Sequence, residues 1–432
     1  MVLAVLLLFG GTVAIWGQGN VRSLDKDQLF ALVEQNSKRL QAQRTQEQVA
    51  QQGVGVAKSQ RLPDIGATVT ASYLGNALMT NRHFGDVMGL HSPHFGNSFS
   101  LEAKQTVYAG GAIHTGIRIA ELTAEQARTG TLQRREEERF LALGQYLDIA
   151  KIDNRIQVVE QNQRLTQKLI GDVKARHDQG MALKNDVTRY ELQMQNLQLD
   201  LTKLKDNRSI LNHQLCNTLG IGDVYIVPTE NLTSAQWGRE GETYWQQTAT
   251  SEAPVLQLSR LSSQVALQQV IMVRSELLPK VAFIAADQLN GPITYELPPI
   301  NRNLNIWYVG VGVNYSLSSL FKSNKKLRQA RTAVLLTQKE HEVTAEQVNN
   351  QIQQAYTDYE QSYVELQTQL KKVELARQNY QVVNDRYLNQ LALVTDMIDA
   401  SNVKLDAELG EADARINVAY AYYRLMYIAG KL

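Results

Sequence analysis

The strongest candidates for a charged functional site are two acidic residues near the end of the chain. Asp396 and Asp399 are three residues apart, so in a helix they lie on one face. Carboxylates placed in this way can attract cations. A simpler interpretation is that both acids are solvated on a helix surface, or that Asp396 caps a helix that begins after a turn.

Three histidines, His83, His91 and His94, lie within the stretch 81–97, which also contains Gly85, Gly89, Pro93 and Gly96. Histidines so close together are possible metal ligands. No cysteine or paired carboxylate accompanies them, and the one acid in the stretch is Asp86. We therefore expect an exposed loop and no metal site.

Other chemical signatures argue against an enzyme. The single cysteine, Cys216, excludes a disulfide framework and a cysteine-based zinc site, and we expect it to be a small buried apolar residue. The sequence contains no Gly-rich phosphate loop and no nucleophile elbow. Forty-four basic and 43 acidic residues give a net charge of +1, unlike the basic excess of nucleic-acid binders. We expect no catalysis, no cofactor and no nucleic acid.

The first residues predict export. Residues 2–16 carry no charge and are mostly apolar, and Gly17-Gln18-Gly19 offers small residues for cleavage. No Lys or Arg precedes the apolar run, and a buried N-terminal helix is the alternative. Residues 1–19 are therefore expected to be a signal peptide.

An internal repeat organises the rest of the 432-residue chain. We place the first repeat at 20–219, a linker at 220–252 and the second repeat at 253–432, each repeat reading as helix, two strands and long helical hairpin. The matching segments are Leu62-Pro63 with Leu278-Pro279, Gln145-Tyr146 with Ala355-Tyr356, and Arg176–Gly180 plus Asp186 with Arg386–Gln390 plus Asp396.

Long helices are predicted in both repeats. No proline lies between Pro93 and Pro228 or after Pro299. From Val187 the apolar residues recur in alternating steps of three and four, broken once at Arg208, which is typical of coiled-coil packing. Each uninterrupted segment would be about 100 Å long as a helix. Such helices form rods, coiled coils or tubes.

Strands are predicted where apolar and polar residues alternate, at 65–73, 98–107 and 309–317. The run 281–286 is apolar on both faces and is a weaker case. These lengths suit a strand that crosses a bilayer at a tilt, although a half-buried soluble sheet has the same period. Four strands cannot close a barrel, whereas three chains would supply about 12 strands, enough for a water-filled lumen.

The order and spacing of these segments resemble the TolC-like outer-membrane efflux proteins. The resemblance rests on Leu62-Pro63, the strand end Val107–Gly111, Gln145-Tyr146 and the turn 176–187, most of which recur in the second half. It implies a mainly α fold with a membrane β-barrel. Long antiparallel helical hairpins would form an α-barrel tunnel, and four strands per chain would complete a trimeric barrel of about 12 strands.

The same resemblance implies a function and partners. Family members passively conduct exported compounds or proteins across the outer membrane, in tripartite efflux or type I secretion systems. The expected partners are two further copies of the chain, a periplasmic adaptor (membrane fusion) protein, an inner-membrane pump and outer-membrane lipid. The expected location is the outer membrane of a Gram-negative bacterium, with a periplasmic extension.

Site residues follow by matching positions. The resemblance implies that the turns at Arg176–Gly180 and Arg386–Gln390 form the periplasmic tip and dock the adaptor, with Gln390 replacing the family's turn glycine. It implies that Asp396 and Asp399 face the closed aperture, where repulsion between carboxylates would raise their pKa values. Asp186 and Tyr387 match positions that hold the aperture shut, although Asp186 could equally cap the following helix.

Two other classes of protein remain as alternatives. A periplasmic or cytoplasmic coiled-coil scaffold would explain the heptads but not a strand pair at the same point of each repeat. A periplasmic adaptor would show a single helical hairpin flanked by compact β-rich domains, and this sequence has a duplicated plan instead.

Overall fold

The computed structural model describes residues 21–229, 238, 240–389 and 391–432. The predictions for the signal peptide at 1–19 and for Gln390 fall outside the described residues. The chain divides into two compact units. Unit 1 takes in Met1–Gln43, Thr131–Pro254 and Ala345–Leu432, and unit 2 takes in Arg44–Gly130 and Val255–Thr344.

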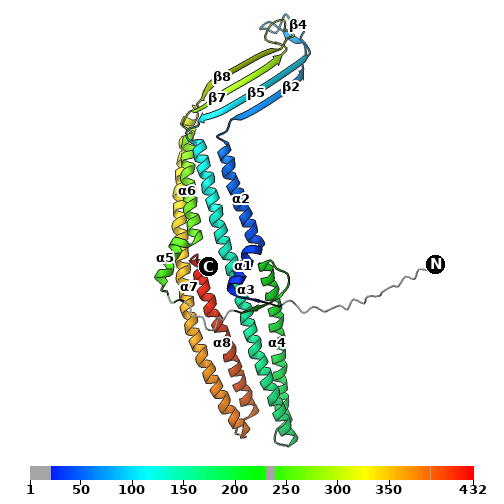
Figure 1. Ribbon diagram of the computed structural model, residues 1–432, viewed down its shortest axis with the longest axis vertical. Helices are drawn as coiled ribbons and strands as arrows, with labels where there is room; N and C mark the ends of the chain where they lie inside the picture. Colours follow the sequence, from blue (N-terminus) through cyan, green and yellow to red (C-terminus); the bar gives the residue numbers. More distant parts are fainter. Residues whose placement is uncertain (1–20, 230–237, 239, 390) are drawn as a thin grey trace, which may run out of the picture. The chain divides into compact units, whose positions relative to one another are not determined.

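The chain is mainly helical, as predicted, and its elements follow the repeated order (Figure 1). The first half contains β1 (Val21–Leu24), α1 (Lys26–Asn36), α2 (Lys38–Ser59), β2 (Asp64–Tyr73), β3 (Ala77–Met79), β4 (Met88–Leu90), β5 (Phe95–Tyr108), α3 (Ala112–Asp178) and α4 (Lys184–Leu219). The second half contains β6 (Tyr225–Pro228), α5 (Glu242–Glu252), α6 (Pro254–Ser275), β7 (Lys280–Gly291), β8 (Leu304–Asn314), α7 (Ser319–Leu388) and α8 (Val394–Ile428).

The proline-free segments form the long helices. α3 has 67 residues and α7 has 70. α3 begins just after Gly110, whose φ of +63° is a backbone conformation that favours glycine. A side chain there would also meet the carbonyl oxygen of Ser275, which lies 2.7 Å from the position of a Cβ atom.

Among the described residues, no helix has the length and apolar character that a membrane span requires.

Unit 2 contains an antiparallel four-stranded sheet with the order β2-β5-β7-β8. The predictions at 65–73 and 98–107 match β2 and β5, and the weaker run 281–286 lies inside β7. The strand predicted at 309–317 was misplaced, because β8 begins at Leu304 and ends at Asn314. Beyond Asn314 the alternation continues, but Ser316 accepts hydrogen bonds from the backbone and the hydroxyl of Ser319 and the chain turns into α7.

The pairing register gives this sheet two different faces. On one face lie mostly apolar side chains, and several are more than half exposed: Ile65, Val69, Phe283, Trp307, Val309, Val311 and Val313. The other face of β2 and β5 is polar, with Thr68 opposite Ser100 and Thr70 opposite Ser98. On β7 and β8 this face also carries Ile284, Ile306 and Tyr308. An exposed apolar face of this size requires an apolar partner.

Both edges of the sheet are open. Within the described part of the chain, β2 pairs only with β5, and β8 pairs only with β7. All ten residues of β2 are exposed. Open edges with unpaired N–H and C=O groups are normally covered or paired with another chain.

The stretch 81–97, expected to be an exposed loop, contains the short strand β4, which pairs with β3, and the first residues of β5. The His94 ring stacks on Tyr73 with 5.2 Å between centroids, and His91 meets His94 edge to face. No group of metal-binding side chains is found among the residues described. Ring stacking accounts for His91 and His94.

Unit 1 has its core where β1 pairs with β6 in parallel and lies against the helices. We call β1, β6 and α1 the equatorial layer. The Tyr146 hydroxyl of α3 donates to the Leu24 carbonyl at 2.9 Å. The core also contains Leu29, Leu143, Ile226, Ile416 and Tyr423. Cys216 is 1% exposed in this core, as predicted.

Candidate functional site

The turn between α3 and α4 is closed by Gly180. Its φ is +74°, and its N–H donates to the His177 carbonyl at 2.8 Å. The N–H of Met181 donates to the Arg176 carbonyl, also at 2.8 Å. These two bonds satisfy carbonyls that the end of α3 leaves free, and the glycine permits the left-handed backbone that they need.

The turn between α7 and α8 has the same long-range bond. The N–H of Leu391 donates to the Arg386 carbonyl at 2.7 Å, which repeats the bond from Met181 to Arg176. The Arg386 guanidinium also donates to the Leu391 carbonyl at 3.3 Å. Arg176 and Arg386 therefore hold equivalent places at the ends of the two long helices.

Asp186 and Asp396 also hold equivalent places. The carboxylate of Asp186 accepts the Leu183 N–H at 3.2 Å, and that of Asp396 accepts the Leu393 N–H at 3.0 Å. Each acid is in the first turn of its helix, where a negative charge is favourable. Both side chains thus have the capping role that was their alternative interpretation, as the third helical residue rather than as the N-cap.

A contact between Arg176 and Tyr387 is among those that join the two helical hairpins at this end of unit 1. The Arg176 guanidinium lies over the Tyr387 ring, 5.1 Å from its centroid. It also donates to the Tyr387 carbonyl at 3.5 Å. Burial raises the pKa of the Tyr387 hydroxyl, Arg176 opposes that rise, and Asp186 and Asp172 add to it. Arg176, Asp186 and Tyr387 therefore lie close together, and the contact between Arg176 and Tyr387 was not among the sequence-based expectations.

A small apolar cluster supports this contact. Its buried members are Leu169, Ile170, Val173, Tyr190, Met194, Tyr387, Val394 and Met397. Burial raises the pKa of the Tyr190 hydroxyl, which has no hydrogen-bond partner among the described residues. Next to the cluster is a pocket of about 310 Å³ that both hairpins line, including Arg176, Asp186 and Tyr387. We call this the tip pocket.

Asp396 and Asp399 lie on the first two turns of α8 and are exposed. No hydrogen bond or ion pair of Asp399 is found within the described residues. Asp396 is engaged with its own helix end, whereas Asp399 is free to meet solvent or another chain. The two predicted aperture acids are thus structurally unequal.

Sequence reasoning missed several residues at this end. Arg189 and Asn185 line the tip pocket, and Asp172 acts on Tyr387. Met397, which follows Asp396 directly, is fully buried between the hairpins. The heptad series from Val187 does include Tyr190 and Met194, and both are buried in this cluster.

The chain matches the model of the outer membrane efflux protein family over residues 29–221 and 245–431, and it belongs to that family. This confirms the resemblance to TolC-like proteins. The family consists of efflux channels of the outer membrane. A search of curated protein sequences gives no significant match.

Solved structures show the same fold. The outer membrane protein VceC from Vibrio cholerae is 14% identical, with a TM-score of 0.76 and coverage of 94% of this chain and 96% of VceC. The Campylobacter jejuni CmeC outer membrane channel is 12% identical, with a TM-score of 0.77 and coverage of 94% and 85%. The open state of the Neisseria gonorrhoeae MtrE outer membrane channel is 12% identical, with a TM-score of 0.75 and coverage of 94% and 88%.

Proposed function

We propose that this protein is the outer-membrane channel of a tripartite efflux or type I secretion system, and that it passively conducts substrates from the periplasm to the outside. The observation that supports this most directly is the sheet of unit 2. It combines two open edges with an exposed apolar face, in a chain of the efflux family.

The open edges argue for a trimer. Lipid does not tolerate unpaired backbone groups, so a membrane sheet must close into a barrel. One chain supplies a four-stranded sheet, so a homotrimer supplies about 12 strands, above the minimum of about eight for membrane barrels. The apolar face with Val69, Val309 and Val311 would contact lipid, and the opposite face, which is polar on β2 and β5, would line a wet lumen.

Unit 1 then forms the periplasmic tunnel, and its tip closes and docks the adaptor. In this proposal the turns with Arg176, Gly180, Arg386 and Gln390 contact the adaptor, and Asp186 and Tyr387 help to hold the tip shut. Support comes from the tip pocket, which Arg176, Asp186 and Tyr387 line together.

The same proposal places Asp396 and Asp399 at the closed periplasmic aperture. In a trimer, the Asp396 and Asp399 carboxylates of all copies would lie near one axis and attract cations. The exposure of both side chains in the single chain supports this. An inner-membrane pump would supply the energy, because the proposed channel is passive.

Export and repeat boundaries complete the proposal. Residues 1–19 would be removed as a signal peptide, and repeats at 20–219 and 253–432 would be joined by a linker at 220–252. Export places the mature chain in the outer membrane of a Gram-negative bacterium, with unit 1 in the periplasm.

The experiment that tests this function is the native mass of the protein, extracted by detergent from a purified outer-membrane fraction. A stable trimer that forms a conducting pore in planar bilayers supports the proposal. A monomer or dimer in the soluble fraction would contradict it and favour a coiled-coil scaffold instead. An insoluble product in the inner-membrane fraction would contradict it as well.

A further inference from the structure

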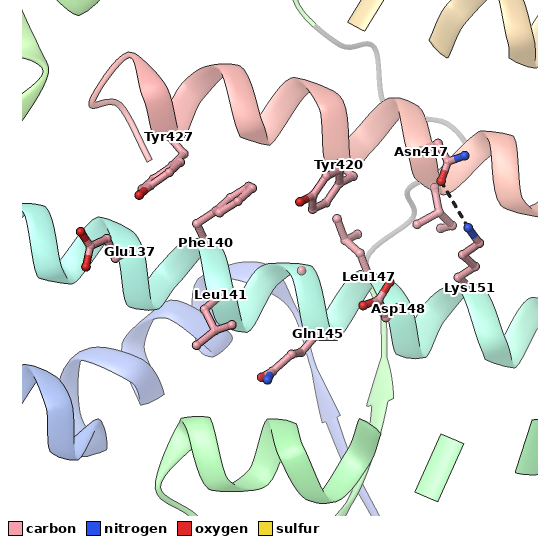
Figure 2. A pocket seen from close by; sticks show the side chains of 12 residues that line it. Glu137, Phe140, Leu141, Gln145, Leu147, Asp148, Lys151, Asn417, Tyr420 and Tyr427 are labelled. Carbon is pink, nitrogen blue, oxygen red and sulfur yellow. Dashed lines mark hydrogen bonds between the residues drawn. The ribbon is translucent and has the colours of Figure 1, made fainter. Parts of the chain in front are cut away.

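A second cavity in unit 1 lies away from the tip. It is a groove of about 480 Å³ between α3 and α8, within the size range of small-molecule sites. Figure 2 shows Phe140, Tyr420 and Tyr427 between the two helices, and Leu141 and Gln145 on the other side of α3. We call this the α3/α8 groove.

Gly144 forms the floor of the groove between these two groups of side chains. A Cβ atom at Gly144 would meet only the Tyr420 ring, at an ordinary contact distance of 3.8 Å. The space above the helix backbone is therefore open, and the missing side chain is what creates it. A larger residue at this position would occupy the groove without straining the helix.

The groove opens on the side of α3 away from the equatorial layer. Tyr146 faces that layer, because its hydroxyl bonds to the Leu24 carbonyl. Gly144 and Asp148 are each two residues from Tyr146, which is a rotation of about 200° around the helix. For the proposed tunnel we assign this groove to the lumen side, because it lies on the side of α3 opposite the equatorial layer.

One wall of the groove is aromatic. The Phe140 ring stacks on Tyr427 with 4.7 Å between centroids and an interplanar angle of 4°. Phe140 also contacts Tyr420 at 5.5 Å, and Tyr420 is 41% exposed. An exposed aromatic surface beside a bare helix backbone suits a flat apolar group, and the ring faces attract cations.

One carboxylate that lines the groove, that of Asp148, forms no ion pair among the described residues, although Lys151 acts on it electrostatically. Glu137 is held by Arg134 at 2.7 Å. Lys151 is held by Asp413 at 3.8 Å and by the Asn417 amide oxygen at 3.4 Å. Asp148 forms no hydrogen bond or ion pair within the described residues, and its side chain is exposed (Figure 2).

A neighbouring acceptor is also unused. The side-chain oxygen of Gln145 is buried and accepts no hydrogen bond among the described residues. The exposed carboxylate of Asp148 is therefore an acceptor in the groove lining for a donor with a positive charge, which would compete with Lys151 for it.

We propose that the α3/α8 groove is a transit site for organic cations that carry a flat aromatic body and a protonated or quaternary nitrogen. The aromatic body lies over Gly144 against Tyr420, and the positive charge lies beside Asp148. This inference rests on the proposed function for its place in the lumen, and it names the chemical class of substrate that the tunnel retains.

The test uses the full chain purified in detergent and two fluorescent probes, measured by anisotropy. Ethidium is the aromatic cation, and N-phenyl-1-naphthylamine is a neutral aromatic of similar size. We expect Asp148→Asn to weaken ethidium binding about tenfold, the loss typical of a charge-assisted contact, and to leave the neutral probe within about twofold. Added salt should weaken ethidium binding in the native protein and not in Asp148→Asn.

A second variant tests the shape of the groove. Gly144→Leu should weaken the binding of both probes by about tenfold or more, because the side chain fills the space over α3. Gly171→Leu is the matched control, since Gly171 is also in α3 and nothing lies within 4 Å of its Cβ position. If circular dichroism shows that Gly144→Leu does not fold, the binding of the two probes to Asp148→Asn still tests whether the groove binds aromatic cations.

The outcomes separate this inference from the proposed function. Ethidium binding that is unchanged in Asp148→Asn and Gly144→Leu overturns the groove, even if the protein is a trimeric pore. Equal loss of both probes in Asp148→Asn overturns the role of the charge. Selective loss of ethidium in a protein that is not an outer-membrane trimer would support the groove and refute the channel.

Discussion

Arg208 of α4 forms an ion pair with Asp153 of α3, with 3.1 Å between Nε and Oδ1. The Arg208 side chain is 3% exposed, and its guanidinium also donates to the Ile226 carbonyl of β6 and to the Asn212 amide oxygen. It lies over the Tyr225 ring, 3.6 Å from the centroid. Arg208, the one residue that breaks the heptad series of α4, therefore links β6 of the equatorial layer to α3 and α4.

Asp153→Ala should destabilise the protein by about 3 kcal/mol, because it leaves a buried guanidinium without its counter-ion. Adding Arg208→Met should recover part of that loss, since an apolar side chain of similar length needs no partner. Thermal unfolding of the purified protein measures both effects. Arg424→Ala is the control, because its pair with Asp358 is partly exposed and is worth less than about 1 kcal/mol. Equal losses in Asp153→Ala and Arg424→Ala would contradict the special role of Arg208.

Glu136 should make the stability depend on pH. It is 7% exposed, and burial raises its pKa to about 7, with Arg135 and Arg139 opposing and Glu252 adding to the rise. The folded state therefore keeps a proton that the unfolded state releases near its ordinary pKa of 4.5. Stability should fall as the pH rises from about 4.5 to about 7 and then level off, by up to about 3 kcal/mol.

Glu136→Gln tests that dependence. We expect no change in stability at pH 4 and a gain at pH 8, since the variant carries no buried charge at either pH. Glu342→Gln on α7 is the control, because Glu342 is exposed and pairs with Lys339 at the surface. A pH profile that Glu136→Gln leaves unaltered would remove Glu136 as the titrating group.

Closure of the tip can be tested by a disulfide. Asp186 and Tyr387 line the same tip pocket, so Asp186→Cys with Tyr387→Cys, in a Cys216→Ala background, should crosslink on oxidation. Oxidation should then abolish export and bilayer conductance, and a reductant should restore both. Each single-cysteine variant serves as the control. A folded trimer in which the two cysteines never crosslink would refute the proposed pairing.

The aperture acids can be tested separately because their local roles differ. Asp399→Asn should reduce the cation preference of the pore several-fold in single-channel recordings, and it disturbs no hydrogen bond of the described residues. Asp396→Asn should have a similar effect on selectivity but also weaken the start of α8, at a cost of about 1 kcal/mol. Asp186→Asn removes the equivalent bond at α4 and serves as the control for that cost. If the cation preference is unchanged both in Asp399→Asn and in the double variant Asp396→Asn with Asp399→Asn, these acids do not lie at the aperture.

Most of the helices and strands could be predicted from local sequence pattern alone. Lack of proline was enough to predict the long helices α3 and α7, and heptad spacing to predict α4, because helix formation depends on neighbouring residues. Alternation predicted β2 and β5 well, since one face is apolar and the other small and polar. It misplaced β8 because Tyr315 and Leu317 continue the period beyond Asn314, where the serines redirect the chain into α7.

The amino-acid sequence by itself determined the family, the repeated order of helix, strands and hairpin, and the equivalence of Asp186 and Asp396. All of these depend on residue types at fixed spacing along the chain. Only the tertiary structure decided that Arg208 meets Asp153, that Arg176 lies over Tyr387, and that Gly144 leaves a groove beside Tyr420. The paired residues are far apart along the chain, and no local sequence pattern marks Gly144. Their roles therefore arise only when separate helices pack together.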